Sequence, residues 1–303
     1  MIPIHLQLDW KPNAQFAGIL WAHHQGWYQE LGIDLHIHPW EPYVDPVSAL
    51  ERDGFWIVST EDNLLIRARD RGLSAQAIAA MMQYSGLGWI ALKSSNISSI
   101  ADLKGKRIGI HGDGETGLKV SLAQFGLSAD DVDIVEIGYD YPQLLRSGDF
   151  AAVQCLVMVE PLELAHEGFE LCVMPAYEWG YEVYSQVLAT SEQAIASTPD
   201  ILTHFLEMTF EGWRHAFAHP QDVIRIVVDE YLRESSHQVQ TELLLAMQPL
   251  FEGTVGHPKL GWMTLERWQK SIDYLKTYGV IQTAIAPEEV MTNDLMAAAC
   301  ARS

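Results

Sequence analysis

Basic residues and cysteines are scarce in this chain of 303 residues. Only 19 Lys and Arg stand against 40 Asp and Glu, which gives a formal net charge of −21. A surface this negative repels phosphate backbones and anionic lipids, so nucleic acid and membrane surfaces are not expected as partners. The three cysteines are odd in number, widely spaced and form no CxxC pair. We therefore expect neither a disulfide framework nor a cysteine zinc site.

The sequence also lacks a secretory signal and a convincing membrane span. The longest uncharged stretch, residues 72–92, contains serines, glutamines and glycines that a lipid-facing helix tolerates poorly. We interpret it as a buried strand followed by a crossover. Met1 leads almost directly into a strand-like segment at residues 4–8. The expected location is therefore cytoplasmic, or periplasmic or extracytoplasmic if a leader was removed.

Apolar residues are abundant enough for a large core. They make up 48% of the chain and include ten Trp, eleven Tyr and nine Phe, which excludes a disordered protein. In the first ninety residues, short segments with strand periodicity alternate with single helical segments. Strands joined by single helices pair in parallel, which predicts an α/β fold with doubly wound sheets. The predicted strands are 4–8, 33–38, 55–59 and 75–82, and the predicted helices are 16–31, 45–52 and 61–71.

The same order of elements begins again near Trp89, and the length of the chain suggests two domains. From about Val187 the apolar spacing becomes mainly helical. We predict two lobes with a central cleft. The predicted strands of the second unit are 107–111, 134–137 and 150–159. The predicted boundaries are 1–87 and 188–303 for lobe one, 88–187 for lobe two, and hinges near 86–88 and 184–187.

Ligands of open parallel sheets bind outside the carboxyl ends of the strands, where the loops converge. That rule selects residues that are rich in aromatic rings and carboxylates and poor in Arg and Lys. Rings can stack on a flat ligand and carboxylates can accept its amino protons, which favours a neutral or weakly basic heterocycle. The candidate ligand-binding residues are Asp9, Trp10, Asn13, Trp40, Glu61, Tyr84, Gly114, Thr116 and Glu160.

Three of these candidates also have a structural interpretation to consider. Trp10 could belong to the core at the end of a strand, and Glu61 could cap the helix that follows it. Glu160 ends a very apolar strand and precedes a proline, a costly place for an unpaired charge. That position favours a binding role for Glu160.

The loop 112–117, which contains Gly114 and Thr116, could hold an anion at a helix N-terminus. It lacks the Gly-Lys-Ser/Thr sequence of a phosphate-binding loop, and Asp113 and Glu115 would repel a phosphate. We expect it to meet a neutral polar group or only to turn the chain.

Twelve histidines raise the question of a metal site. His36 and His38 point to one face of a strand, but no carboxylate at a fixed spacing completes a ligand set, and there is no HExxH. The GxSxG motif of a nucleophile elbow is also absent. We therefore expect no metal, no cofactor and no catalytic residues.

Several short segments, taken together and in order, resemble one known family. They resemble the thiamine-pyrimidine-synthase/alkanesulfonate-binding-like family of type II periplasmic binding proteins over nearly the whole chain. The matching segments are 8–13, 16–18, 26–28, 31–34, 59–65, 97–109, 160–161, 184–185, 188–190, 261–263 and Trp268.

The resemblance implies a type II periplasmic-binding-protein fold, with two lobes and a hinge, that serves an ABC importer. The opening motif is most similar to that of proteins that bind formylaminopyrimidine, a thiamine precursor. By that likeness, Trp10, Asn13 and Glu61 would hold an aminopyrimidine. Glu160, and Tyr184 in another matching segment, complete the implied site. The implied partners are a small heterocycle and an ABC permease, with the protein acting as a monomer.

Other branches of the family imply alternative functions. Some bind riboflavin or serve as sensor inputs. The fungal-type branch is a single-turnover synthase of hydroxymethylpyrimidine (HMP) phosphate, which consumes its own histidine and pyridoxal phosphate with iron. It carries a cysteine-rich run where this chain has residues 181–185, and its donor histidine falls near Asn63. Neither feature is present here. The binding role is therefore the first expectation, and the synthase is the alternative.

Overall fold

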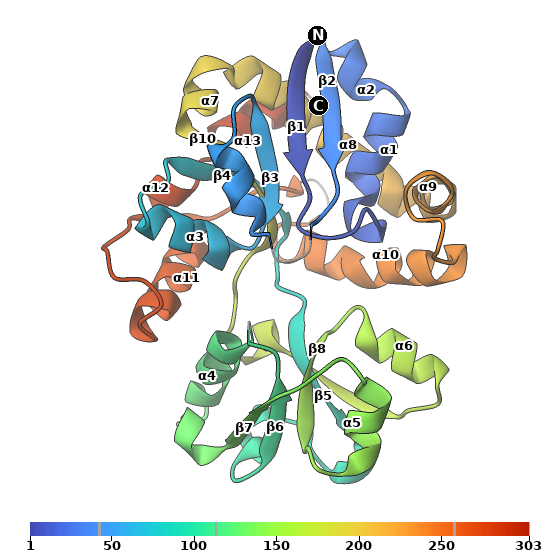
Figure 1. The fold of residues 1–303 in the computed structure, drawn as a ribbon, viewed down its shortest axis with the longest axis vertical. Helices are drawn as coiled ribbons and strands as arrows, with labels where there is room; N and C mark the ends of the chain where they lie inside the picture. The colour runs from blue at the N-terminus through green and yellow to red at the C-terminus, as the bar shows by residue number, and fades with distance from the viewer. Residues whose placement is uncertain (42–43, 113, 257–258, 303) are drawn as a thin grey trace. The chain divides into compact units, whose positions relative to one another are not determined.

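A computed structural model describes residues 1–41, 44–112, 114–256 and 259–302. The chain forms two compact units, each with its own five-stranded sheet (Figure 1). Unit 1 comprises Met1–Gln83 and the chain from Tyr184 onward, and unit 2 comprises Tyr84–Val183. The chain therefore leaves and re-enters unit 1 about four residues earlier than the boundaries given above. The cleft and the hinges stay predictions.

The sheet of unit 1 has the strand order β2-β1-β3-β10-β4. β1 pairs in parallel with β2 and β3, because helical crossovers connect these strands. β10 lies between β3 and β4 and runs antiparallel to both, because it enters directly from unit 2. The strands are β1 (Ile2–Gln7), β2 (Ile33–His38), β3 (Trp56–Thr60), β4 (Ala75–Met82) and β10 (Ser185–Ser191).

Helices cover both faces of this sheet. α3 (Asp62–Asp70), α11 (Leu265–Thr277) and α12 (Pro287–Val290) lie on one side, where their apolar residues share a core with β3, β4 and β10 (Figure 1). On the other side α1 (Ala17–His24) crosses α8 (Pro199–Ala218) so closely that a Cβ on Gly212 would lie 2.1 Å from the Gly18 carbonyl oxygen. The remaining helical elements of unit 1 are η1 (Ala14–Phe16), α2 (Trp27–Glu30), η2 (Pro46–Glu51), α7 (Glu192–Ser197), α9 (Pro220–Ile226), the π-helix η7 (Val227–Tyr231), α10 (His237–Glu252) and α13 (Asp294–Cys300).

The sheet of unit 2 has the order β7-β6-β8-β5-β9. β6 is parallel to β7 and β8, whereas β5 is antiparallel to β8 and β9. The strands are β5 (Leu87–Leu92), β6 (Arg107–Ile110), β7 (Asp133–Glu136), β8 (Ala152–Leu156) and β9 (Leu171–Pro175). The helices that matter below are α4 (Glu115–Ala123), α5 (Tyr141–Ser147) and α6 (Glu160–His166).

The α/β fold class with two lobes is confirmed, and one detail of the prediction is wrong. The region after residue 187 is mainly helical as predicted, once β10 ends at Ser191. The predicted strand 150–159 is shorter, because Leu156 ends β8 and helix α6 begins at Glu160. Within the described ranges, no helix is both long enough and apolar enough to cross a membrane.

Candidate functional site

Two carboxyl groups meet at the carboxyl ends of β1 and β3 in unit 1. Asp9 follows β1, and its Oδ1 accepts a hydrogen bond of 2.9 Å from Ser59 Oγ on β3. Glu61 follows β3, and its Oε1 accepts a hydrogen bond of 2.9 Å from Ser185 Oγ on β10. Burial raises the pKa of Asp9 to about 6. Burial, and next the charge of Asp9, raise the pKa of Glu61 to about 8.

The helix-capping interpretation of Glu61 does not hold for its side chain. Glu61 occupies the N-cap position of α3, but its carboxylate makes no capping hydrogen bond to the helix. It is bonded to β10 instead, through Ser185 and the backbone N–H of Gln186. The carboxyl group is therefore held at the strand ends, where ligands of such sheets bind.

Gln186 connects both carboxyl groups, and no sequence pattern indicated it. Its side chain donates to Asp9 while its backbone N–H donates to Glu61. The residue is 4% exposed and has φ 48°, a left-handed conformation that is uncommon outside glycine. Such strained residues persist where the surroundings fix them, and they concentrate at functional sites.

A third carboxyl group lies beside this pair. Asp62, at the start of α3, accepts a hydrogen bond of 2.6 Å from Ser271 Oγ, and burial raises its pKa to about 6. The guanidinium of Arg267 favours the ionised form of Asp62. It also donates to the Gln83 carbonyl oxygen and lies 4.9 Å from the ring centroid of Tyr184. The edge therefore holds more carboxylate than positive charge.

Buried oxygen atoms without a hydrogen-bond partner concentrate at the same edge. In the described part of the chain, six side-chain oxygens are buried and unpaired, and five of them lie at the last residue of β1 or β3, just after β4, or at the start of β10 or α3. Unpaired buried acceptors are costly, and native proteins pair nearly all of them. Four of the five are amide oxygens, which can only accept hydrogen bonds, so this edge favours a ligand or water that donates. The five atoms are Gln7 Oε1, Thr60 Oγ1, Asn63 Oδ1, Gln83 Oε1 and Gln186 Oε1.

Two tryptophans follow β1 and β2 and form an aromatic surface next to Asp9. The ring centroids of Trp10 and Trp40 lie 4.8 Å apart with an angle of 40° between the planes. Trp10 is 44% exposed, so the alternative that it is a core residue is wrong. An exposed indole beside a buried carboxyl group can stack on a planar ligand.

Two further candidates of unit 1 have structural partners. Asn13 is buried and its Oδ1 accepts a 2.9 Å hydrogen bond from Gln15 N, which caps η1. Tyr184 is fully buried, and its hydroxyl accepts a 2.7 Å hydrogen bond from Thr264 N. Their ligand roles stay predictions.

The strand ends of unit 2 carry aromatic rings. Tyr84 stacks on Tyr177 with the ring centroids 4.6 Å apart. His111, directly after β6, stacks on Tyr139 at 4.4 Å, and its Nε2 lies 3.0 Å from the Tyr141 hydroxyl. Tyr139 and Tyr177 were missed as candidates: Tyr139 lies in the loop after β7, and Tyr177 lies in the short helix η6 (Ala176–Trp179) that follows β9, a strand the sequence pattern did not predict.

The glycine loop of unit 2 is held by a buried glutamine. Gln154 Oε1 accepts a 2.9 Å hydrogen bond from His111 N, and a Cβ on Gly114 would lie only 1.9 Å from the same oxygen. Thr116 lies in the first turn of α4, partly buried. Asp113, expected to repel phosphate, falls outside the described residues. Glycine at 114 is thus explained by packing, while ligand contact by Gly114 and Thr116 stays a prediction.

Glu160 also has a local structural role. Its Oε2 accepts a 2.6 Å hydrogen bond from Leu156 N, which closes the turn between β8 and α6. Burial raises the pKa of Glu160, and burial also raises the pKa of the neighbouring Cys155 thiol. The charge at this costly position is therefore partly explained without a ligand.

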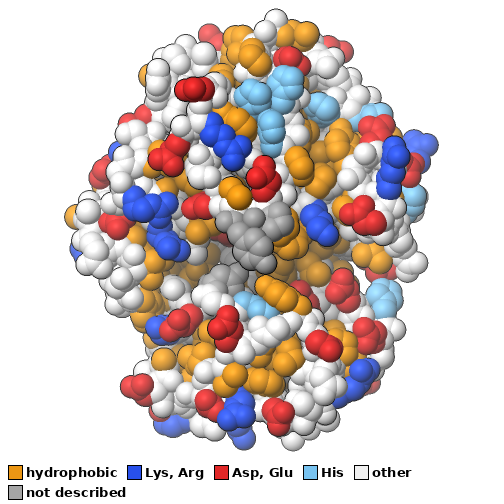
Figure 2. Space-filling view, in the orientation of Figure 1, with side chains coloured by type: hydrophobic (Ala, Val, Ile, Leu, Met, Phe, Trp, Pro, Cys, Tyr) orange, Lys and Arg blue, Asp and Glu red, His pale blue; other side chains and the backbone are white. Residues whose placement is uncertain are grey.

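Histidines gather on one face of the unit 1 sheet, over β1 and β2 (Figure 2). His5 Nδ1 lies 3.0 Å from His38 Nε2, and His5 stacks on both His36 and Trp56. Asp34 supplies the carboxylate missing from the sequence pattern, 3.2 Å from His36 Nε2. Even so, no group of three or more such side chains within the described ranges has a geometry that could hold a metal ion.

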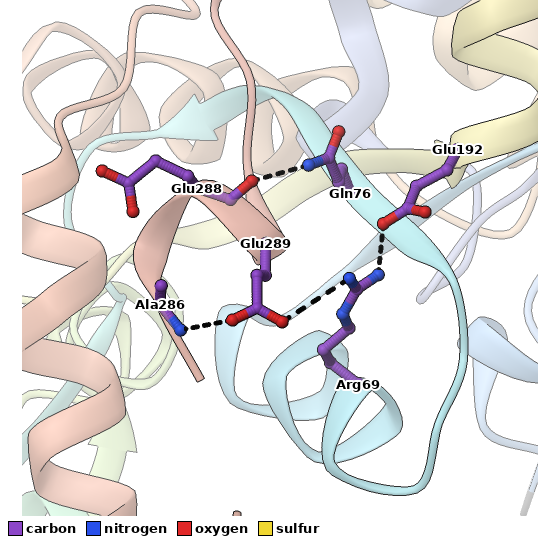
Figure 3. Close-up of polar contacts among 6 residues, drawn as sticks. All are labelled: Arg69, Gln76, Glu192, Ala286, Glu288 and Glu289. Atoms are coloured by element: carbon purple, nitrogen blue, oxygen red, sulfur yellow. Dashed lines mark hydrogen bonds and ion pairs between the residues drawn. The ribbon is translucent and has the colours of Figure 1, made fainter. Parts of the chain in front are cut away.

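An open groove of about 760 Å³ lies elsewhere in unit 1, between the start of α11 and residues 284–289. None of the residues above lines it. Figure 3 shows how its α12 side is fixed: the Arg69 guanidinium pairs with Glu192 and Glu289, and Gln76 Nε2 donates to the Glu288 carbonyl oxygen at 2.7 Å. These contacts join α12 to α3, β4 and α7, so we assign them to the fold.

Three curated relatives resemble the chain over nearly its full length. The riboflavin-binding protein RibY of Chloroflexus aurantiacus is 23% identical and covers 97% of this chain and 86% of its own. The formylaminopyrimidine-binding protein of Halalkalibacterium halodurans is 22% identical, and the match covers 96% of this chain and 89% of the relative. The 4-amino-5-hydroxymethyl-2-methylpyrimidine phosphate synthase of Legionella pneumophila is 26% identical, with 96% and 91% covered.

Among solved structures, the periplasmic aliphatic sulphonate binding protein of Escherichia coli is similar with a TM-score of 0.75, at 14% identity over 95% of this chain and 90% of its own. This likeness confirms the periplasmic-binding-protein fold that the sequence resemblance implies. Residues 13–223 match the family described as NMT1/THI5 like, and the chain belongs to that family.

Proposed function

We propose that this protein is the substrate-binding protein of an ABC importer and that it captures a thiamine-related aminopyrimidine at the strand ends of unit 1. In this role it acts as a monomer outside the cytoplasmic membrane and delivers its ligand to a permease. The named formylaminopyrimidine-binding relative supports the ligand class, and the family fold supports the role.

One observation carries the proposal: an indole surface borders an edge of unpaired buried oxygens and carboxyl groups. Trp10 and Trp40 would stack on the pyrimidine ring. Asp9 and Glu61 would accept hydrogen bonds from its amino group and a protonated ring nitrogen. Charge-assisted hydrogen bonds of this kind are shorter and stronger than neutral ones. Sulfonates are disfavoured as ligands, because they need cationic or amide donors and this edge is dominated by acceptors.

The test is a ligand panel measured by thermal shift and then by calorimetric titration. The panel contains formylaminopyrimidine, 4-amino-5-hydroxymethyl-2-methylpyrimidine, thiamine, riboflavin, pyridoxal phosphate and taurine. A ligand that binds only the native state raises the melting temperature by mass action. We expect the two aminopyrimidines to give the largest shifts. Taurine binding more tightly than either pyrimidine would overturn the ligand assignment.

Riboflavin is the second candidate, because the relative RibY covers as much of the chain as the pyrimidine binder does. An isoalloxazine ring has one ring N–H that these oxygens could accept from, but its several acceptors would find few donors at this edge. Riboflavin binding more tightly than both aminopyrimidines would favour this candidate.

The synthase alternative predicts a different observable. Incubation with pyridoxal phosphate and ferrous iron under air would yield a pyrimidine phosphate product and a modified histidine in the protein. We expect mass spectrometry to find neither, since the donor-histidine region of that branch carries Asn63 here.

A further inference from the structure

Donors and acceptors are unevenly distributed at the strand-end site of unit 1. Ser59 Oγ and the Gln186 amide already donate to Asp9. Ser185 Oγ and the Gln186 backbone N–H already donate to Glu61. What remains unpaired at this edge is oxygen, and every unpaired oxygen named above belongs to an amide or a hydroxyl group.

The positive charge near Asp9 and Glu61 already has other partners. Among the described groups, Asp62 from α3 acts on Glu61, and Arg267 from α11 and Tyr184, just before β10, lie beyond Asp62. The Arg267 guanidinium donates to the Gln83 carbonyl oxygen, lies over the Tyr184 ring and favours the charge of Asp62. The pair must therefore hold a proton or meet a cation.

Gln186 extends this acceptor set. Its amide nitrogen donates to Asp9, and Oε1 of the same amide is buried without a hydrogen-bond partner. The residue is 4% exposed and keeps a left-handed backbone although it is not glycine. A strained, buried side chain with one free acceptor is a second sign, independent of the carboxyl groups, that this position meets a donor.

We propose that this site binds its ligand as a cation, an aromatic ring that carries an amidinium-like N–C–NH₂ edge, and that Gln186 is a specificity-determining residue that accepts from that edge beside Asp9 and Glu61. The inference rests on the proposed function, because it concerns the same site. A ring that arrives neutral takes the proton of Glu61: the O–H bond breaks, an N–H bond forms on the ring nitrogen, and a carboxylate faces a cation. A ligand that is already cationic releases that proton to solvent.

This assignment makes binding depend on pH in a defined direction. With the pKa of Glu61 raised to about 8, the free site keeps a proton at pH 6 and loses it toward pH 9. A permanently cationic ligand should therefore bind more tightly as pH rises through this range. The linkage of one proton changes the dissociation constant up to tenfold per pH unit.

The experiment uses a matched probe pair and the full chain. Benzamidinium is cationic throughout pH 6–8 and keeps its N–H donors, whereas benzamide has the same size and is neutral. Calorimetric titration at pH 6, 7 and 8, in two buffers of different ionisation enthalpy, counts the protons exchanged. We expect benzamidinium to bind at least tenfold more tightly than benzamide at pH 8, with most of one proton released at pH 7. 4-Amino-2-methylpyrimidine, measured alongside, should show less release, because it can take the proton itself.

Three variants locate the effect. Glu61→Gln should abolish the pH dependence of benzamidinium binding between pH 7 and 8, which leaves only the titration of Asp9 near pH 6. Gln186→Gly should weaken binding about tenfold while relieving the backbone strain, so that it still folds. Glu30→Gln changes an exposed glutamate of α2 and should leave the affinity for benzamidinium and its pH dependence unchanged. Melting curves confirm that each variant is folded.

The outcomes separate the inference from the proposed function. Aminopyrimidine binding without proton exchange, and with equal affinity for benzamidinium and benzamide, overturns the cationic-ligand inference and leaves the proposed function standing. No binding by any aminopyrimidine overturns both.

Discussion

Both units place a glutamate just beyond a buried strand, and the two glutamates differ in what holds them. Glu61 of unit 1 accepts from Ser185 and Gln186 on β10, a strand far away in the sequence. Glu160 of unit 2 accepts from Leu156 N–H, four residues earlier in the chain. Burial raises the pKa of both carboxyl groups.

The difference between them is one of surroundings. Glu61 shares its edge with Asp9 and with unpaired buried oxygens, so its charge is not compensated by the protein. Glu160 closes a turn: it accepts from the Leu156 N–H, and its charge acts on the buried Cys155 thiol. The sequence position after a strand is thus the same for both glutamates, and only the contact between distant strands distinguishes Glu61 from Glu160.

The largest expected effect concerns Glu61 and the pH dependence of stability. Its folded pKa, about 8, lies above the ordinary 4.5, so its contribution is complete below about pH 4.5 and is lost as pH rises toward 8. Because Glu61 is only partly buried, solvent screening reduces the full value, and we expect a loss of roughly 2–4 kcal/mol. Glu61→Gln should remove this loss and be the more stable protein at pH 8. Urea unfolding at pH 5, 6.5 and 8 measures the difference, and parallel curves for the two proteins would contradict it.

The next effect tests whether the glycine loop of unit 2 is structural. Gly114→Ala places a methyl group against the Gln154 amide and should lower the free energy of unfolding by about 1–3 kcal/mol. Gly112→Ala is the matched control in the same loop, because a Cβ there meets nothing within 4 Å. Equal denaturant midpoints for the two variants would show that the loop accommodates the added methyl group without loss of stability.

Local patterns were enough to predict most of the fold. Alternation predicted β1 and β2, and the interpretation of residues 55–59 as a buried strand identified the segment that becomes β3. The capping interpretation of Glu61 was reasonable from its neighbours, but the true partner, Ser185, is 124 residues away. A local pattern cannot reveal a contact between residues so far apart in the sequence, because the contact forms only once β10 lies between β3 and β4.

The sequence also predicted part of the candidate site, namely the residues that follow parallel strands. The rule that ligands bind at strand ends selected Asp9, Trp10 and Glu61, which the structure gathers at one edge. It could not select Gln186, because β10 enters the sheet antiparallel and presents its first residues, not its last, at that edge. The left-handed backbone of Gln186 is also invisible in sequence, since glutamine does not favour it.

The third effect concerns affinity alone. Trp10→Ala should weaken aminopyrimidine binding by about 1–2 kcal/mol, the low part of the range for base–aromatic stacking, because the indole is 44% exposed. Its melting curve should match that of the unaltered protein. Trp268→Ala is the opposite control: that indole is fully buried, and its loss should lower stability by about 3–5 kcal/mol. A Trp10→Ala variant with lower stability and unchanged affinity would restore the core interpretation.

The smallest expected effect lies at Glu160 and sharpens the contrast with Glu61. Glu160→Gln keeps an oxygen that can accept from Leu156 N–H, so its free energy of unfolding should change by less than about 0.5 kcal/mol, whereas Glu160→Ala loses that bond and should cost about 1 kcal/mol. Aminopyrimidine affinity should be the same for both variants and the unaltered protein, because the carboxylate is engaged by its own turn. Titration of the two variants beside their unfolding curves measures this. If both variants lose affinity tenfold while Glu160→Gln keeps its stability, Glu160 binds the ligand as Glu61 does, and the contrast between the two glutamates no longer stands.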